Sequence, residues 1–448
     1  MGRDMLNAMK YISTVPFSGL FNWSVQYLND SKIAFSKAYP MIRIGEFLKR
    51  NKTAVSIEDD KTYKRVTIKV RNGGVFLRDE EKGCNIGTKN QFLISKGQFL
   101  LSKIDARNGA FGVVPDELDG SIITGNFWTF DVNYNIVNPH YLTLLTTTQA
   151  FVRFCEQASN GTTNRHYLQE PLFLNIKVPI PSLEEQDKLV EEYNKLIASA
   201  DKLIKESMQV DSNIVQYFNE SIGLKQNSTQ VQLLSFIRFA DITTRWDTFA
   251  ASNKISANVP IYPLGNYIVN IATGTTPPTS KKEYFNGNIK FYTPSDITGE
   301  MYLTKSERAL SQKAIDDKKA RIFHKGDILF VGIGSTVGKV GIVQDNLVSS
   351  NQQITGFTLN KELICPEFVF YYLHYHKKLT TAEHSKTTLP IVNQEKISNI
   401  PIPVPDMSQQ LAMVKQINKM RDKILSLQKV SIENRIQALK NFEYQIFL

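Results

Sequence analysis

The chain has 448 residues, of which 42% are hydrophobic and 21% are charged, and its formal net charge is +10. This composition is typical of a folded globular protein and excludes a collagen-like or largely disordered chain. The length is sufficient for about two to four domains. The basic balance favours a polyanionic partner, with nucleic acid before a membrane surface.

Cysteine and histidine usage gives no sign of a disulfide framework or a metal site. Cys84, Cys155 and Cys365 are scattered, and the six histidines lack metal-ligand spacing. We therefore expect a reducing, cytoplasmic compartment and no bound metal. The N-terminal segment lacks the apolar stretch of a signal peptide, and no run approaches the ~20 apolar residues that span a bilayer. No membrane partner is expected.

The chain contains a long internal repeat. Residues 96–112 and 325–341 both begin with Lys-Gly, continue with an apolar run and end in two spaced glycines, at a constant offset of 229 positions. The Pro-x-Pro segments at 178–181 and 402–405 match at an offset of 224. A period of roughly 220 residues is far too long for a solenoid and indicates two copies of a whole domain. Whatever the protein binds should be bound in two places.

The two globular copies, about 10–181 and 230–404, are expected to mix helices and strands. Residues 64–70 alternate charged and apolar side chains, as a half-buried strand does. Short apolar runs bounded by glycine predict further strands, and prolines open two aromatic-rich segments that predict helices. The strands are predicted at 99–101, 112–114, 328–330 and 340–343, and the helices at 139–156 and 366–380.

A long amphipathic pattern follows each Pro-x-Pro segment. In the first, Ser182 is a suitable N-cap, and apolar residues then recur with alternating steps of four and three, which is a heptad seam. The seam residues are Leu189, Tyr193, Leu196, Ala200, Leu203, Val210, Ile214 and Tyr217, with Ser207 as polar filler. The second pattern, after Pro405, reads Met413, Ile417, Met420, Ile424 and Leu427, then changes phase to Ile432, Ile436, Leu439 and Ile446.

These two patterns predict an antiparallel two-helix coiled coil with a globular domain at each end; the alternative is one helix packed on each domain. The fold class is therefore α+β, with two similar mixed α/β recognition domains separated by the helices. The expected boundaries are 1–182 and 225–405 for the domains, and 183–224 and 406–448 for the helices.

Segments that resemble catalytic motifs fail on inspection. Residues 332–339 resemble a phosphate loop, but Ile333 replaces the first glycine and Val340 replaces the magnesium-binding hydroxyl, so a β-hairpin turn is the better interpretation. Asn138-Pro139-His140-Tyr141 resembles the adenine-gripping motif of amino-methyltransferases, but no methyl-donor loop accompanies it, and a helix start is favoured. We expect the chain itself to catalyse nothing.

Polar loops at matched positions of the two copies are suited to nucleic acid, because hydroxyl, amide and basic groups can bind phosphates and base edges. The candidate DNA-binding residues of the first copy are Arg107, Asn108, Asn126, Asn160, Thr162, Thr163, Asn164 and Arg165. Those of the second copy are Thr273, Thr275, Thr276, Lys281, Lys282, Ser335, Thr336, Lys339, Gln352, Ser385, Lys386 and Thr387.

Nearly the whole chain resembles the specificity subunit of type I restriction–modification systems. The resemblance is carried by Tyr262-Pro263-Leu264-Gly265, by residues 272–277, 284–287, 325–329, 334–340 and 402–405, and in the first copy by 44–45, 96–97 and 178–186. The first copy departs at 105–109 and has Arg50-Asn51-Lys52 where the second has its Thr-Gly-Thr-Thr-Pro loop. The two domains should therefore read different base sequences.

The resemblance implies that each domain reads part of a split double-stranded DNA site in the major groove. It also implies that the paired helices bind modification subunits, which would hold S-adenosylmethionine, and that a separate restriction subunit would use ATP and Mg²⁺. No cofactor is expected in this chain. A helix over 183–222 is about 60 Å long, against about 34 Å for a turn of DNA, so the site should be bipartite and asymmetric with an unread spacer.

Three alternatives remain open from the sequence. The chain could be an orphan or modification-only specificity subunit, which the sequence does not separate from the restriction complex. A self-sufficient adenine methyltransferase would need the missing cofactor loop. A coiled-coil scaffold without a nucleic-acid role would show no DNA binding.

Overall fold

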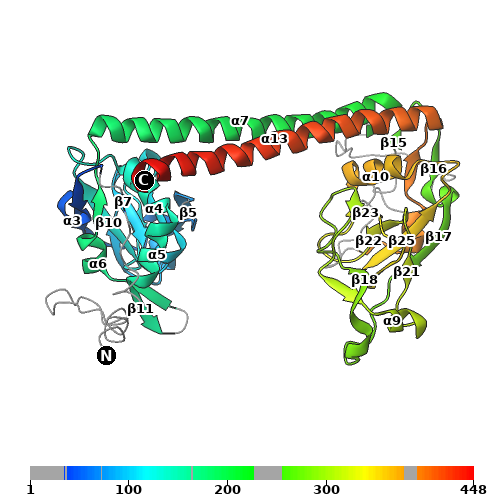
Figure 1. Ribbon diagram of the computed structural model, residues 1–448, viewed down its shortest axis with the longest axis horizontal. Coiled ribbons are helices and arrows are strands. Elements are labelled where there is room, and N and C mark those ends of the chain that lie inside the picture. Colours follow the sequence, from blue (N-terminus) through cyan, green and yellow to red (C-terminus); the bar gives the residue numbers. More distant parts are fainter. Residues whose placement is uncertain are drawn as a thin grey trace, which may run out of the picture. The chain divides into compact units, whose positions relative to one another are not determined.

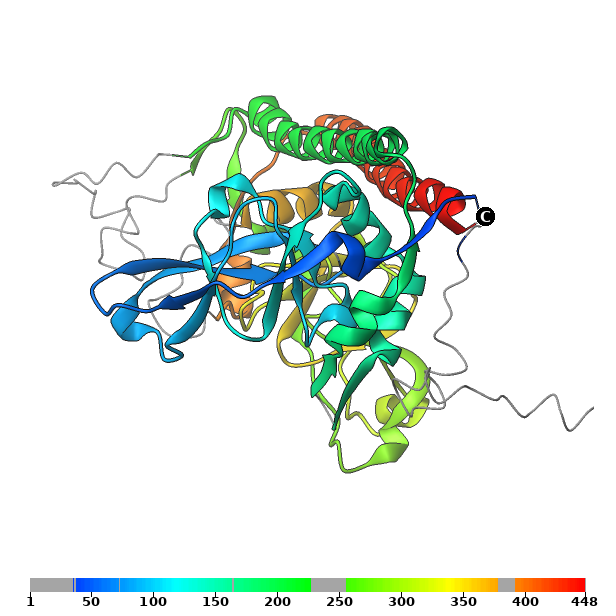
Figure 2. The ribbon, with the colours of Figure 1, turned by 90° about the vertical axis from the view of Figure 1, so that its left-hand side faces the viewer.

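The structure is a computed structural model that describes Phe35 and residues 38–71, 73–162, 165–226, 255–377 and 391–447. The chain forms two compact units. Unit 1 comprises Met1–Ile204 and Lys429–Leu448, and unit 2 comprises Lys205–Gln428. Each unit is described by itself below; Figure 1 gives the element labels, and Figure 2 shows the same ribbon in a second view.

Unit 1 contains the first copy and is built around two main sheets. One is four-stranded, in the order β2-β10-β7-β8, and the other is five-stranded, in the order β3-β6-β9-β4-β5. The strands are β1 (Met41–Arg43), β2 (Leu48–Asn51), β3 (Ala54–Ser56), β4 (Thr62–Ile68), β5 (Val75–Lys82), β6 (Asn90–Leu93), β7 (Phe99–Ser102), β8 (Phe111–Val113), β9 (Ile122–Ile123), β10 (Phe127–Val132), β11 (Ser159–Thr162), β12 (Arg165–Leu168) and β13 (Lys177–Pro179). The helices and 3-10 turns are α3 (Ile44–Phe47), η3 (Gly83–Asn85), η4 (Ala106–Asn108), η5 (Asp116–Leu118), α4 (Pro139–Thr147), α5 (Gln149–Gln157) and α6 (Glu170–Asn175).

The core of unit 1 is aromatic. All four residues of β7 are buried, as expected for a strand with a neighbour on each side. Phe111 of β8 packs edge-on against Phe151 of α5 with ring centroids 5.9 Å apart. The predicted helix over 139–156 is divided into α4 and α5 at Thr148, whose extended backbone ends α4 and whose hydroxyl accepts the N–H of Phe151 as an N-cap.

Unit 2 contains the second copy and repeats this plan. Its sheets have the orders β17-β25-β22-β23-β19 and β20-β18-β24-β21. The strands are β14 (Lys225–Gln226), β15 (Ile255–Ser256), β16 (Ile261–Pro263), β17 (Ile268–Thr273), β18 (Phe285–Tyr292), β19 (Tyr302–Leu303), β20 (Arg308–Leu310), β21 (Ile322–Phe323), β22 (Ile328–Val331), β23 (Val340–Val343), β24 (Val348–Ser350), β25 (Ile354–Leu359) and β26 (Pro401–Pro403). The helices and 3-10 turns are η7 (Leu264–Tyr267), η8 (Lys282–Tyr284), α9 (Gln312–Asp316), α10 (Pro366–Tyr375) and α12 (Gln394–Ser398). The predicted helix 366–380 is confirmed over Pro366–Tyr375 as α10, which ends there with His376 as its C-cap, earlier than predicted; residues 378–380 lie outside the described part.

The predicted duplication is confirmed at the level of topology. The order β2-β10-β7-β8 in the first copy corresponds to β17-β25-β22-β23 in the second. In the smaller sheets, the parallel pair β4–β9 corresponds to β18–β24. The copies differ at the edges of their sheets. In the first copy β3 adds an edge strand beside β6, and in the second β19 adds one beside β23.

The repeated glycines have structural roles at the matched hairpins. Gly109 and Gly338 adopt positive φ angles of 73° and 87°, which side chains with a Cβ disfavour. Gly112 and Gly341 allow a second strand to approach. A Cβ on Gly112 would lie 2.9 Å from Val75 Cγ2, and one on Gly341 would lie 2.5 Å from Leu303 Cδ2. The segment 332–339 joins the antiparallel strands β22 and β23, so the predicted hairpin turn is confirmed.

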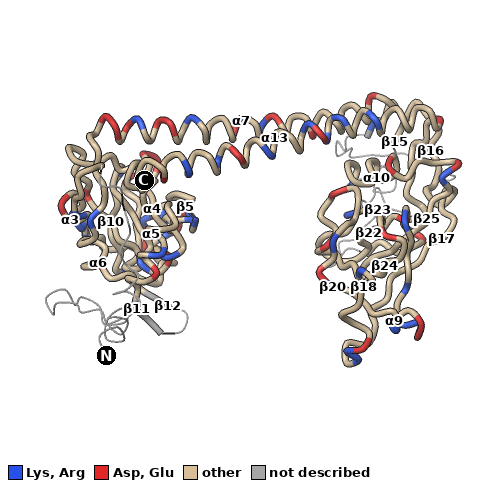
Figure 3. The backbone as a smooth tube through the Cα atoms, in the orientation of Figure 1, with Lys and Arg blue, Asp and Glu red and all other residues tan. Residues whose placement is uncertain are grey.

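The two long helices are confirmed as α7 (Leu183–Ile222, 40 residues) and α13 (Met407–Phe447, 41 residues). In unit 2 they lie alongside one another and run antiparallel, because Lys423 pairs with Glu206 at 2.8 Å and Gln409 Nε2 donates to the carbonyl of Ser221 at 2.9 Å. In unit 1 the Ser431 hydroxyl donates to the carbonyl of Ala200 at 2.9 Å. Acidic and basic residues are interspersed along both helices (Figure 3).

The phase change predicted in the second helix is misplaced. Ile432 and Ile436 are 58% and 50% exposed, whereas Ser431 and Ala438 are buried, so the heptad steps continue past Leu427 to Ala438 through small residues. The phase changes after that point, because the next buried residues are Phe442 and Ile446, and Ile446 is buried as predicted. Ser431 and Ala438 do not look like core residues in a sequence, but they suit close contact between helices. None of the described helices has the length and apolar character needed to cross a membrane.

Candidate nucleic-acid interface

In the second copy, the structure brings three of the predicted polar segments together. The Thr276 hydroxyl donates to Gln352 Oε1 at 2.6 Å, which joins the loop after β17 to the turn between β24 and β25. Thr273 Oγ1 lies 3.1 Å from Thr355 Oγ1 and accepts a bond from Gln394 Nε2 at 2.9 Å. The turn of the β22–β23 hairpin is attached to the same place, because the N–H of Gly332 donates to the carbonyl of Gln353 at 2.8 Å.

The tight fit of this cluster depends on Gly274. A Cβ there would lie 2.4 Å from the carbonyl oxygen of Asn351, so a larger residue would push the loop away. Thr275 accepts the backbone N–H of Arg321 at 2.8 Å, and this bond fixes the loop on its other side. The loop is thus held by the close approach of its backbone at Gly274 and by one hydrogen bond from each of the Thr275 and Thr276 hydroxyls. An exposed row of hydroxyl and amide groups, Thr275, Thr276 and Gln352, is presented by a rigid support.

The hairpin turn attached to this row carries further polar and basic residues. Ser335 is exposed on the hairpin turn, while Thr336 and Lys339 are half-buried. The pKa of Lys377, just beyond α10, is lowered mainly by burial and also by the nearby positive charge of Lys339.

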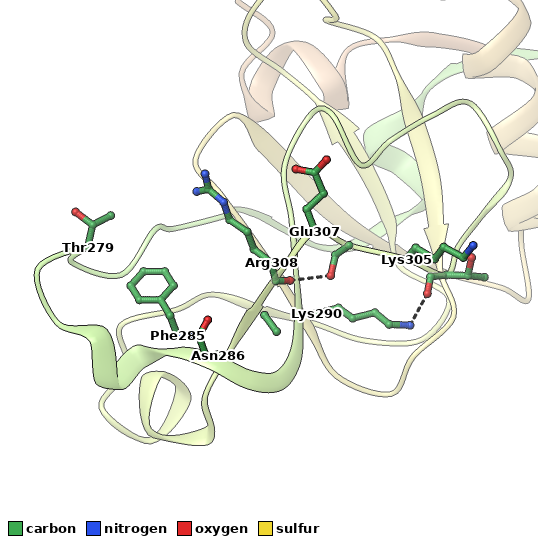
Figure 4. Close-up of a pocket in the computed structure, with 10 residues that line it drawn as sticks. Thr279, Phe285, Asn286, Lys290, Lys305, Glu307 and Arg308 are labelled. Carbon is green, nitrogen blue, oxygen red and sulfur yellow. Dashed lines mark hydrogen bonds between the residues drawn. The ribbon is translucent and has the colours of Figure 1, made fainter. Parts of the chain in front are cut away.

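Lys281 and Lys282 lie in a different part of unit 2, at the 3-10 turn η8, where the Lys281 ammonium lies 5.6 Å from the centre of the Tyr284 ring. This turn leads to a groove of about 830 Å³ that is lined by residues of β18, of β20 and of the segment just before β20 (Figure 4). The Lys290 ammonium is neutralised there by Asp345 at 2.7 Å. Lys305 and Arg308 are exposed, and Figure 4 shows Arg308 and Phe285 on one side of the groove and Lys290 on the other. No sequence motif marks Lys305 or Arg308.

In the first copy, the predicted segments meet around Lys103, which sequence reasoning missed. Its backbone N–H donates to the carbonyl of Asn126 at 3.0 Å, and its carbonyl accepts the N–H of Leu168 at 2.8 Å. Its ammonium lies 5.2 Å from the centre of the Tyr167 ring. Lys103 therefore links the turn before β10 with the β11–β12 hairpin.

The remaining candidates of the first copy fall on two connections. Arg107 and Asn108 lie on η4, between β7 and β8, and Asn108 is exposed. Asn160, Thr162 and Arg165 lie on the β11–β12 hairpin, where Thr162 is paired with Arg165. Thr163 and Asn164 in the first copy, and Ser385, Lys386 and Thr387 in the second, lie outside the described residues.

The resemblance of Asn138-Pro139-His140-Tyr141 to a methyltransferase motif has a structural explanation. The Asn138 side chain caps α4 by accepting the N–H of His140 at 2.8 Å, and its amide donates to Asp187 at 2.7 Å. The residue is therefore used to hold a helix start. Across the described ranges, no group of three or more His, Cys, Asp or Glu side chains is arranged to hold a metal ion.

The architecture defines a duplicated α/β domain, each copy of which is followed by a long helix and presents polar loops. The family model described as the type I restriction modification DNA specificity domain matches residues 26–210 and 266–438. The chain belongs to this family of DNA specificity subunits.

Individual relatives agree with this assignment. The type I restriction enzyme HindI specificity subunit of Haemophilus influenzae is 24% identical over 389 residues, which cover 76% of this chain and 83% of that protein. The MjaIX specificity subunit of Methanocaldococcus jannaschii is 30% identical over 147 residues, but this match spans 31% of the chain and only 33% of the relative. A chain from a solved structure of the type I restriction–modification system has the same fold, with a TM-score of 0.60, 16% identity, and coverage of 92% of this chain and 98% of that one.

Proposed function

We propose that this chain is the non-catalytic DNA-reading subunit of a type I restriction–modification complex and that it recognises a bipartite, asymmetric site. The observation that carries the proposal is the recurrence of supported polar loops at matched positions of two duplicated domains. In the second copy these are the turn before β25, which holds Gln352, and the turn of the β22–β23 hairpin; in the first they are the turn before β10, which holds Asn126, and η4 between β7 and β8. Different side chains at matched positions would read different bases.

The chemistry would be done by partner subunits. Modification subunits would carry S-adenosylmethionine and flip the target base, and a restriction subunit would use ATP and Mg²⁺. The use of Asn138 as a helix cap supports a recognition role over a self-sufficient methyltransferase. A subunit that serves modification alone would use the same DNA-reading surfaces. All of these assemblies would act in the cytoplasm.

Exposed apolar residues on the long helices favour docking of modification subunits there. Met208 on α7 is 65% exposed and Ile432 on α13 is 58% exposed, and they occupy equivalent positions, 224 residues apart, in the duplicated pattern. Exposed apolar surface marks protein contacts where it is contiguous. Equivalent positions on the two helices would accept two copies of the same partner.

The proposal is tested by selecting binding sites from a random duplex pool with the chain assembled on a modification partner. We expect a motif of two unlike half-sites around a fixed spacer. In a Thr276→Val/Gln352→Leu variant, the preference should relax in one half-site and stay unchanged in the other. Thr298→Val, at an exposed position outside the polar row and the groove of Arg308, is the control. Recovery of one contiguous symmetric motif, or no enrichment, would contradict the proposal.

A further inference from the structure

The hairpin formed by β4 and β5 in unit 1 is attached to a loop of the proposed DNA-binding surface. At its tip the backbone N–H of Arg71 donates to the carbonyl of Asn108 at 2.7 Å, so the tip lies against η4. Arg71 has a φ of 58°, in the left-handed region that a side chain with a Cβ disfavours. The carbonyl of Asn108 thus anchors an uncommon backbone conformation.

The tip combines apolar and basic side chains that are exposed. Val70, Phe76 and Leu77 are 46%, 39% and 46% exposed, although they are large and apolar. The Lys69 ammonium lies 4.2 Å from the centre of the Phe76 ring, and Arg71 is exposed beside them. A β-bulge in β5, where the register shifts between Arg65 and Val66 of its partner, accounts for consecutive exposed residues on this strand.

The chemistry of the tip fits a DNA groove better than a protein surface. Lys69, Arg71 and the neighbouring Arg107 are all cationic, which suits the phosphates that border a groove. A two-stranded β-ribbon fits the major groove, which is about 12 Å wide. Thymine is the base that presents a methyl group there, and apolar side chains contact it.

The second copy has no matching ribbon tip. Its connection between β18 and β20 spans residues 293–307 and contains β19, which pairs with β23. The hairpin is therefore a point at which the two copies differ within a shared topology. A difference at this place would give the two copies different base preferences.

We propose that the β4–β5 tip enters the major groove of the half-site read by the first copy, where Val70 and Phe76 contact the 5-methyl group of a thymine. The inference rests on the proposed function, because it requires the complex to bind a bipartite site. It assigns to this half-site at least one thymine whose methyl group contributes to affinity.

The test uses the chain assembled on its modification partner and the selected duplex, with uracil replacing thymine at one position at a time. Loss of one buried methyl group should weaken binding about fourfold at a thymine in the first-copy half-site. In a Val70→Ala/Phe76→Ala variant, the thymine and uracil duplexes should bind alike. Because both residues are exposed, this variant should fold and should keep the preference for the other half-site.

Met41→Ala, at an exposed position on β1 of the same unit, is the matched control and should keep the response to uracil. The inference is overturned if no uracil substitution in that half-site weakens binding, or if the double variant still distinguishes thymine from uracil. Absence of any sequence-specific binding by the wild-type complex would instead overturn the proposed function, so the two failures are distinguishable.

Discussion

Gln186 and Gln410 make the same hydrogen bonds in the two copies, 224 positions apart. Each lies in the first turn of its long helix and is fully buried. Each accepts, at 2.8 Å, the backbone N–H of the residue before a helix-opening proline, and each donates at 2.9 Å to the carbonyl of a proline five residues earlier. These glutamines tie α7 to the domain in unit 1 and α13 to the domain in unit 2.

Replacing Gln410 by leucine should destabilise unit 2. The substitution leaves the N–H of Cys365 and the carbonyl of Pro405 buried without partners, which costs about 1–3 kcal/mol per buried group. Urea denaturation should show a lower midpoint for Gln410→Leu, and Gln437→Leu, on the exposed face of α13, should leave it unchanged. Equal midpoints for the two variants would show that the glutamine does not hold the helix.

Unit 2 should lose stability as the pH falls from about 6.5 to 4. His376 is buried, with Nε2 2.7 Å from Asn219 Oδ1 on α7, and burial lowers the pKa of its imidazole to about 4. The unfolded chain binds the proton more readily, because its histidine pKa is about 6.5, so stability is complete above 6.5 and falls below it.

The expected loss at pH 5 is about 2 kcal/mol relative to pH 7. Denaturation of the wild type, of His376→Gln and of His140→Gln at both pH values measures it. His140 is exposed, and its variant should behave as the wild type. If His376→Gln retains the full pH dependence, another group is responsible.

Arg308 should contribute to affinity for DNA without contributing to its sequence preference. Its exposed side chain borders the groove lined by β18 and β20, which suits a phosphate. Removing one phosphate contact lowers the slope of log affinity against log salt by about 0.9. Arg308→Gln should therefore reduce the slope by about one while selection recovers the same motif. A changed motif would mean that Arg308 reads a base.

Met208→Glu and Ile432→Glu should each weaken binding of the modification partner. Both side chains are exposed, so a charge should leave folding intact and should oppose an apolar contact. Titration of the partner, followed by sedimentation, should show one partner lost in each single variant and two in the double variant. Lys429→Glu, at an exposed position of α13, serves as the charge control. Unchanged stoichiometry in the double variant would place docking elsewhere.

Local patterns in the sequence predicted much of this fold because the residues that form turns and helix starts determine the backbone at their own positions. Gly109 and Gly338 mark turns that need positive φ angles, and Ser182 and Pro405 precede the long helices. The apolar pattern missed the small residues of the helix contact. Ser431 is polar, but it is buried where its hydroxyl bonds the carbonyl of Ala200, a residue distant in sequence.

The parts of the interface that were missed depend on tertiary contacts. Lys103 and Arg71 belong to no motif. They became part of the surface because β7 and the β4–β5 hairpin bring them to Tyr167 and Asn108. The pairing of Thr276 with Gln352 likewise joins residues 76 positions apart. Spacing along the chain cannot report such pairs, although it did select both of these residues as candidates.

The central claim is that two independent reading domains are joined by helices whose length sets the distance between half-sites. Deleting one heptad from α7 and the facing heptad from α13 removes about 10 Å of helix, or roughly three base pairs. Site selection with the assembled complex should then return the two original half-sites with a spacer shorter by about three base pairs. An unchanged spacer, or altered half-sites, would contradict the account.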